Sequence, residues 1–261
     1  MDIALTQWPL VPVVALLGGF YNEPMGTHTS RTLMLAELKA LLASHPAGKA
    51  DALRSAVVEE NVCAKASRST REKTFRHLRE LYALSDDIVL FRALRALWAR
   101  SPDAQPLLAL LCAVARDPLL RATSKVILDK PEGAPVCSDD MARAIESGFP
   151  GRLKADTLAR TSRNVGSSWT QSGHLRGRAH KLRSTASTTP ESTAFALLLG
   201  YLCGDRGDAL FRTPWAKLTD ASEHVLRAQT EQAGRLGYLE YRHGGGVTEV
   251  TFSHLLSEAA A

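Results

Sequence analysis

Residues 152–183 read RLKADTLARTSRNVGSSWTQSGHLRGRAHKLR, and this stretch carries the strongest indication of fold and function in the chain. Its first half has helical periodicity, which places Leu158, Val165 and Trp169 on one face. The opposite stripe is polar. Arg, Asn and Gln side chains can make bidentate contacts with base edges. The stripe therefore predicts a DNA-contacting helix, and its members are Arg160, Arg163, Asn164, Ser167 and Gln171.

A basic run follows this helix at once. Gly173 and Gly177 make the run flexible, so we expect a loop or short hairpin that serves as a wing or arm. Such an arm suits a phosphate or a minor groove. The basic residues expected to make these contacts are His174, Arg176, Arg178, Lys181 and Arg183, with His180 beside them. The alternative is a solvated polar stripe followed by a disordered basic loop.

Positive charge is concentrated in two segments. Residues 152–183 have a net charge of +7 and residues 65–79 have +5, whereas the whole chain of 261 residues has only +5, so the remainder is acidic by seven charges. An acidic protein with concentrated basic segments favours a polyanionic partner. The cations of the shorter segment are Lys65, Arg68, Arg71, Lys73, Arg76 and Arg79.

The shorter basic segment lies in a predicted helix-turn-helix. Helices are predicted over residues 50–64, with Asn61 and Ala64 on the inner stripe, and over residues 70–84, joined by a serine-rich turn. The hydroxyls of Ser69 and Thr70 and the free N–H groups at that helix start would suit a phosphate. An ordinary helix with a solvated basic face is the alternative interpretation.

The C-terminal part predicts a helix followed by a hairpin. Asp220 and Glu223 resemble a capping box, which would begin a helix that ends at Gly237. Residues 238–243 and 247–252 then alternate with period two around three glycines, a pattern typical of a β-hairpin. This order is the outline of a winged helix, and the residues at its tip expected to contact DNA are Arg242 and His243.

These patterns predict a mainly α fold with helix-turn-helix modules and a C-terminal winged-helix-like β-hairpin. We expect an N-terminal helical domain over residues 1–130, a second helix-turn-helix-like module with its basic arm over 138–188, and a C-terminal module over 189–261. The proline- and glycine-containing residues 130–137 are the predicted linker. Trp169 and Trp215 are expected in the core or at an interface.

Enzyme signals are weak. The eight histidines lack metal-ligand spacing, and neither a nucleophile elbow nor a phosphate-binding loop is present. We therefore predict no catalytic residue, no metal and no cofactor. The four cysteines are widely spaced and predict free thiols in a cytoplasmic protein. The apolar run at residues 10–20 is too short to span a bilayer and lacks the basic start of a signal peptide, which predicts no membrane partner.

Residues 29–84 carry short motifs in a recognisable order. They are Ser30-Arg31 before a leucine-rich helix, the run Val57-Val58-Glu59-Glu60-Asn61, the run Lys65-Ala66-Ser67-Arg68-Ser69-Thr70-Arg71, and the spaced Arg76, Leu78 and Arg79. This stretch resembles the BrxA family of BREX phage-defence systems. The match is good over residues 29–85 and fair to residue 183, and the C-terminal segment looks like an extension. The resemblance implies a small, mostly helical, non-enzymatic DNA-binding protein encoded with defence genes.

The sequence therefore predicts an accessory protein that binds double-stranded DNA through both basic segments and works with other proteins of a defence system. Two alternatives stay open. One is a protein-interaction scaffold whose basic faces dock an acidic partner, and the other is a transcriptional regulator of the defence operon.

Overall fold

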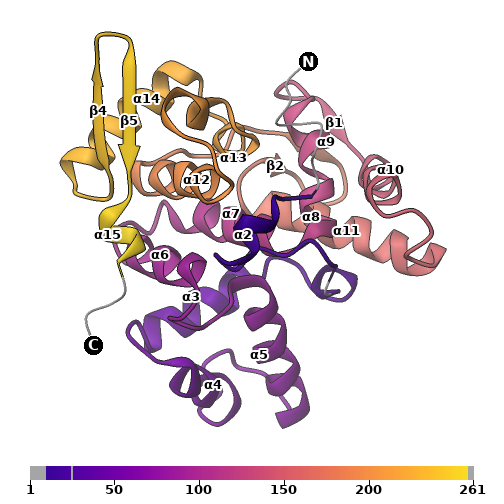
Figure 1. The fold of residues 1–261 in the computed structure, drawn as a ribbon. Coiled ribbons are helices and arrows are strands. Elements are labelled where there is room, and N and C mark those ends of the chain that lie inside the picture. The colour runs from indigo at the N-terminus through magenta and orange to yellow at the C-terminus, as the bar shows by residue number, and fades with distance from the viewer. Residues whose placement is uncertain (1–9, 25, 258–261) are drawn as a thin grey trace.

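The structure is a computed structural model, which describes residues 10–24 and 26–257. It is mainly helical, as predicted, with small antiparallel sheets. No described helix is long and apolar enough to cross a membrane. Figure 1 shows the helices grouped around α7, with the β4–β5 hairpin projecting from one side and α10 and α11 forming the opposite edge.

The N-terminal half comprises the helices up to α7. Ser67 caps α5, because its hydroxyl accepts a hydrogen bond from the backbone N–H of Thr70 at 3.2 Å. The elements are α2 (Val13–Leu16), the 3₁₀ turn η1 (Thr27–Thr29), α3 (Leu35–Ser44), α4 (Ala50–Val58), α5 (Arg68–Tyr82), α6 (Val89–Trp98) and α7 (Gln105–Arg116).

The predicted helix over residues 50–64 is shorter than expected. It ends at Val58, and both Asn61 and Ala64 have positive φ angles of 58° and 49°. Asn61 does not extend the inner stripe of a helix. Its side-chain oxygen accepts the backbone N–H of Lys65 at 2.7 Å, which closes the turn that leads into α5.

The middle of the chain combines short helices with a three-stranded antiparallel sheet of order β1-β3-β2. Residues 130–137, the predicted linker, include β1, which pairs with β3 through Pro135 opposite Leu182. The elements are α8 (Pro118–Ala122), α9 (Ser124–Leu128), β1 (Pro135–Val136), α10 (Ser138–Gly148), α11 (Ala155–Gln171), β2 (Leu175–Arg176) and β3 (Lys181–Arg183).

The C-terminal part contains the expected helix and hairpin. Its long helix is capped by the hydroxyl of Ser222 and not by Asp220, whose φ is 61° and whose carboxylate pairs with Arg183. The elements are α12 (Pro190–Leu202), the 3₁₀ turn η2 (Gly207–Arg212), α13 (Pro214–Lys217), α14 (Glu223–Arg235), β4 (Glu240–Gly244), β5 (Val247–Thr251) and α15 (Ser253–Leu256).

One apolar core joins these groups. All residues from Leu107 to Arg116 in α7 are buried, and α7 contacts α5, α6, α8, α11 and α12. Trp169 and Trp215 are buried at 0% and 2% exposure, which confirms their predicted place in the core. The helix α11, with α7 behind it, is therefore held on a rigid base. The division into domains at residues 130 and 188 stays a prediction.

Candidate nucleic-acid interface

A cavity of about 470 Å³ lies between α10, α11 and the β2–β3 hairpin. None of its described lining residues is an Asp or Glu, whereas four can carry positive charge. Such a lining favours an anionic ligand. The cationic residues of the cavity are Arg163, Arg178, His180 and Lys181, and its other polar side chains are Cys137, Ser138, Ser162 and Ser167.

Lys181 crosses the outer side of α11 at Gly166. A Cβ atom on Gly166 would lie 3.6 Å from the Cδ and Cε atoms of Lys181, so the glycine lets the lysine stem lie flat on the helix. The Nζ atom donates to the hydroxyl of Thr170 at 2.8 Å. Burial lowers the pKa of Lys181. Lys181 is thus the close neighbour of Gly166 on α11.

The basic run after α11 is an ordered hairpin. The register pairs Leu175 with Arg183 and Arg176 with Leu182. Gly177 has a φ of 95°, and a Cβ atom there would lie 2.2 Å from the carbonyl oxygen of His180, so only glycine fits this turn. Arg176, Arg178 and His180 are exposed on the hairpin.

Two members of that run have internal roles in place of the expected DNA contacts. Arg183 is 7% exposed and its guanidinium pairs with both carboxylate oxygens of Asp220. His174 is fully buried, with Nε2 2.9 Å from the carbonyl oxygen of Leu218. Burial, more than the opposing charge of Asp220, sets the pKa of His174 and lowers it to about 4. Both side chains join the hairpin base to the C-terminal part.

The predicted polar stripe of α11 is divided between two neighbours. Arg163 is exposed beside the cavity, and Ser167 lines it. On the other side, the side-chain amide of Asn164 donates to the carbonyl oxygen of His28 at 2.9 Å, and Arg160 donates to that of Thr29 at 2.7 Å. Arg160 remains exposed despite this bond.

Gln171, further along α11, also bonds the segment that follows His28. Its amide donates to the hydroxyl of Thr32 at 2.9 Å and its oxygen accepts the backbone N–H of Leu35 at 3.3 Å. Residues 27–35 therefore cover one side of α11, while Lys181 covers the other. The N-terminal part of the helix is left open, with Lys154, Asp156, Arg160 and Arg163 exposed.

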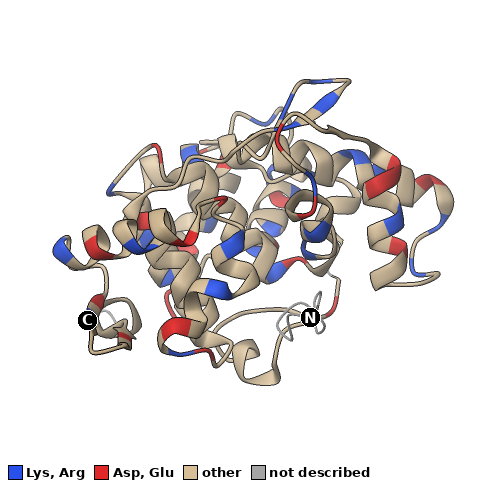
Figure 2. Ribbon diagram, turned by 90° about the horizontal axis from the view of Figure 1, so that it is seen from above, with Lys and Arg blue, Asp and Glu red and all other residues tan. Residues whose placement is uncertain are grey.

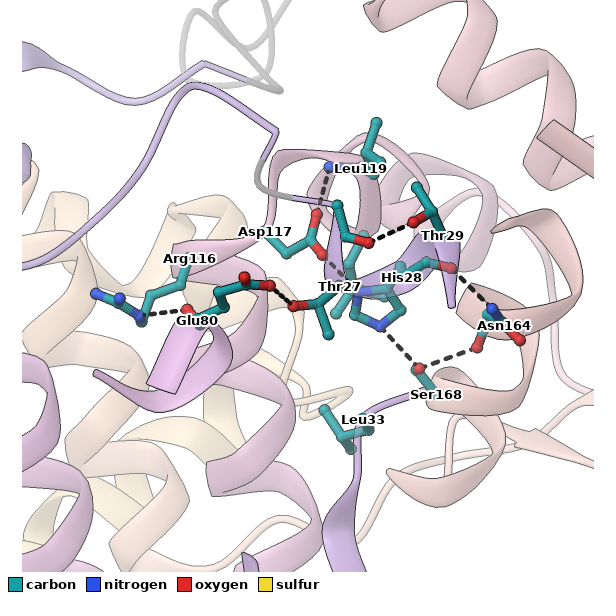
Figure 3. A network of polar contacts seen from close by, with 12 residues as sticks. Thr27, His28, Thr29, Leu33, Glu80, Arg116, Asp117, Leu119, Asn164 and Ser168 are labelled. Carbon is teal, nitrogen blue, oxygen red and sulfur yellow. Dashed lines mark hydrogen bonds and ion pairs between the residues drawn. The ribbon is translucent and has the colours of Figure 1, made fainter. Parts of the chain in front are cut away.

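His28 is the centre of the network that fixes this segment (Figure 3). Its Nδ1 atom lies 2.6 Å from Oδ2 of Asp117, and its Nε2 atom lies 2.9 Å from the hydroxyl oxygen of Ser168. The neighbouring Thr27 donates its hydroxyl proton to Glu80 of α5. One short turn thus connects α5, α8 and α11.

Asp117, His28 and Ser168 contact one another in the order of a nucleophilic triad. Their surroundings, however, are those of residues that stabilise the fold. His28 and Ser168 are fully buried, and the hydroxyl of Ser168 donates to the carbonyl oxygen of Asn164 at 3.0 Å. A triad serine needs access to a substrate, which this burial denies. Burial alone would raise the pKa of Asp117, but His28 and the backbone N–H groups of Leu119 and Leu120 outweigh it and lower that pKa.

The sequence did not indicate this network, because Asp117 lies 89 residues and Ser168 lies 140 residues from His28. No local spacing connects them. The described residues also contain no group of His, Cys, Asp and Glu side chains placed to hold a metal ion. The four cysteines are free, with Cys63 and Cys112 buried and Cys137 exposed at the start of α10.

Three of the six cations of the first basic segment, Lys65, Arg68 and Arg76, have acidic partners on α3, after α4 and on α5. Arg68 forms two hydrogen bonds of 2.7 Å with the carboxylate of Glu59, and Lys65 pairs with Glu37 at 2.8 Å. Arg71 donates to the carbonyl oxygen of Val58 at 3.0 Å, and Arg76 lies 3.7 Å from Glu80.

Among the described residues, Arg71, Lys73 and Arg79 of α5 have no acidic partner. Lys73 and Arg79 are exposed, and Arg79 lies over the ring of Phe75 at 6.0 Å. Ser69 is exposed and Thr70 is half-buried at the helix start. Figure 2 shows Lys and Arg interspersed with Asp and Glu along the helices, which is the arrangement of an ordinary solvated surface.

The tip of the β4–β5 hairpin also combines basic and acidic side chains. Arg242 lies 3.7 Å from Glu249 across the strands, and the ring of His243 lies 2.8 Å from the hydroxyl of Thr248. Both side chains are exposed. The acid-free cavity beside α11 therefore differs from both of these surfaces.

Comparison with known proteins adds no relative: no protein-family model matches the chain, and no curated protein matches it.

Proposed function

We propose that this protein binds duplex DNA through a cationic surface made by the N-terminal part of α11 and the β2–β3 hairpin, and that it is not an enzyme. The residues of this cationic surface are Lys154, Arg160, Arg163, Arg176, Arg178, His180 and Lys181. The observation that carries the proposal is the cavity lining beside α11, which includes four side chains able to carry positive charge and no carboxylate.

Two further cavities of the described residues support this choice by contrast. The cavity between α9 and α10 includes Asp129 and Asp140, and the groove between α14 and β4 includes Glu231 and Glu240. Neither Arg163 nor Arg178 has a carboxylate partner among the described residues. Their charges are therefore available to phosphates, whereas Arg68 and Arg76 of α5 are paired with Glu59 and Glu80.

The order of elements also supports DNA binding. The succession α8–α9, β1, α10, α11, β2 and β3 agrees with the order expected of a winged helix, which supports our proposal that α11 is the reading helix and the hairpin the wing. Reading helices contact base edges mainly through their N-terminal residues. The part of α11 that residues 27–35 leave open is that N-terminal part. The succession α12, α13, α14, β4 and β5 is similar, but it has no strand between its helices.

The biological setting we propose is a BREX-type phage-defence system, which rests on the resemblance of residues 29–85 to the BrxA family. The role would be that of an accessory protein that holds DNA for other proteins of the system. A transcriptional regulator of the operon would use the same surface but would discriminate strongly between DNA sequences.

A protein-interaction scaffold is the second candidate. It is favoured by apolar side chains exposed on and beside α2, where Val13 is 78% and Leu17 is 87% exposed. Apolar exposure of this kind is typical of protein contacts and not of DNA contacts. A scaffold of this type would bind duplex DNA weakly.

Fluorescent duplex DNA titrated at several salt concentrations tests the proposal. Each phosphate contact contributes about −0.9 to the slope of log K against log salt, so the double variant Arg163→Ala/Arg178→Ala should bind at least about tenfold more weakly with a shallower slope. The charge-matched control Arg235→Ala/Arg242→Ala should bind like the wild type. Equal losses in both variants, or no binding by wild type at low salt, would refute this surface.

A further inference from the structure

The cavity beside α11 has more structure than a surface that only follows a DNA backbone. Its volume of about 470 Å³ falls in the range of small-molecule sites. Its walls come from three places: α10, α11 and the hairpin with the strand before it.

The lining of the cavity combines two kinds of side chain. Arg163, Arg178 and Lys181 supply positive charge, and Ser138 and Ser167 supply hydroxyl groups. Its apolar residues, which we call the apolar wall, are Val136, Met141, Ala179 and Leu182. A ligand that satisfies both kinds of side chain carries an anionic group and a flat, weakly polar group, as a nucleotide does.

The carboxylate of Asp140 on α10 does not compete with such a ligand. Asp140 lies 2.6 Å from the Nζ atom of Lys130 and 2.6 Å from a guanidinium nitrogen of Arg143. Asp140 lines the cavity on the far side of α10 and does not line this one. Arg163 and Arg178 keep their full hydrogen-bonding capacity for a phosphate.

We infer that this cavity binds a single nucleotide unit, with its phosphate held by Arg163, Arg178 and Lys181 and its base against the apolar wall. The inference rests on the same cationic surface as the proposed DNA binding. The nucleotide can be free, as a nucleoside monophosphate, or part of a DNA strand, since both present the same phosphate.

Calorimetric titration of the full chain with AMP and with adenosine tests the inference. Because charge-assisted hydrogen bonds to the phosphate carry the binding, adenosine should bind about tenfold or more weakly than AMP. The variant Arg163→Ala/Arg178→Ala should lose AMP, whereas Arg235→Ala/Arg242→Ala should keep it. No AMP binding, equal binding of adenosine, or AMP binding that Arg163→Ala/Arg178→Ala retains would overturn the inference.

A cavity-filling variant separates the two sources of the nucleotide. Ser167→Phe keeps every charge, and the hydroxyl it removes bonds only the carbonyl oxygen of Arg163 in its own helix. Loss of AMP with duplex binding intact would assign the cavity to a free nucleotide, and loss of both would assign it to a nucleotide of the DNA. Duplex titration of the wild type reports on the proposed function separately, so the two can fail independently.

Discussion

The Nε2 atom of His28 lies 2.9 Å from the hydroxyl oxygen of Ser168, although 140 residues separate the two along the chain. Through this contact and the 2.6 Å contact between His28 and Asp117, the turn at residues 27–29 fixes α11 against the N-terminal helices. The orientation of the proposed DNA-contacting helix therefore depends on a residue far from it in sequence.

Replacing His28 by alanine should destabilise the protein strongly. The change leaves the carboxylate of Asp117, which is 3% exposed, without its ring partner. Leaving a buried polar group without its hydrogen-bond partner costs about 1–3 kcal/mol, and more for a charged group such as this carboxylate. Urea unfolding followed by circular dichroism measures this loss. His243→Ala, at an exposed histidine, should change the free energy of unfolding by less than about 0.5 kcal/mol. Similar changes in the free energy of unfolding for both variants would show that His28 does not stabilise the fold.

Asn164 and Gln171 should affect stability and not DNA affinity. Both side chains bond residues 28–35, so Asn164→Ala and Gln171→Ala each remove hydrogen bonds worth about 1 kcal/mol. Thermal unfolding should show lower midpoints, whereas duplex affinity should match that of the wild type. A large loss of affinity in either variant, at unchanged stability, would mean that these two side chains do contact DNA.

Gly177→Ala should weaken DNA binding without changing any charge. Its Cβ atom would meet the carbonyl oxygen of His180 at 2.2 Å, so the turn that presents Arg178 must shift. Gly133→Ala is the matched control, because Gly133 also has a positive φ, of 80°, but has no atom within 4 Å of its Cβ position. Duplex titration should show a loss of affinity for Gly177→Ala and none for Gly133→Ala. Equal affinities of the two variants would show that the hairpin turn does not contribute to DNA binding.

Stability should fall as the pH drops from about 6.5 to about 4. The pKa of His174 is lowered to about 4 in the folded protein by burial, from an ordinary value of 6.5. The unfolded chain therefore binds this proton more readily, so His174 disfavours folding once the pH is below 6.5. Its contribution reaches at most about 3 kcal/mol near pH 4.

Urea unfolding at a series of pH values checks this dependence. His174→Gln removes the titrating ring, so the free energy of unfolding of that variant should vary less over the same range. The groups that face the ring are Asp220, Arg183 and the carbonyl oxygen of Leu218, and they are unchanged in the variant. A pH dependence as steep as that of the wild type would assign the effect to other groups.

Local patterns were enough to predict most helices. The periodicity of residues 156–171 corresponds to α11, and the serine-rich turn leads into α5. The alternation around Gly244 to Gly246 corresponds to the β4–β5 hairpin. Positive φ angles at Asn61 and Ala64 ended a helix that the apolar pattern would have continued. Such a conformation depends on a turn that propensities do not encode.

The candidate site could be predicted only in part, because its members are divided by long-range contacts. A helical projection places Asn164 and Arg163 on one stripe. Residues 27–35, however, cover Asn164 and leave Arg163 exposed. His174 and Arg183 appear in a basic run, yet the C-terminal part buries both. Periodicity shows which face of a helix avoids the core and not what other segment packs on that face.

Hydrogen exchange of the full chain, measured by mass spectrometry with and without duplex DNA, tests the central claim most directly. Our account predicts slower exchange over residues 152–163 and 176–181 when DNA is bound, with residues 27–35 and α14 unchanged. Protection confined to α5 or to the β4–β5 hairpin, with none at the hairpin that carries Arg178, would contradict it.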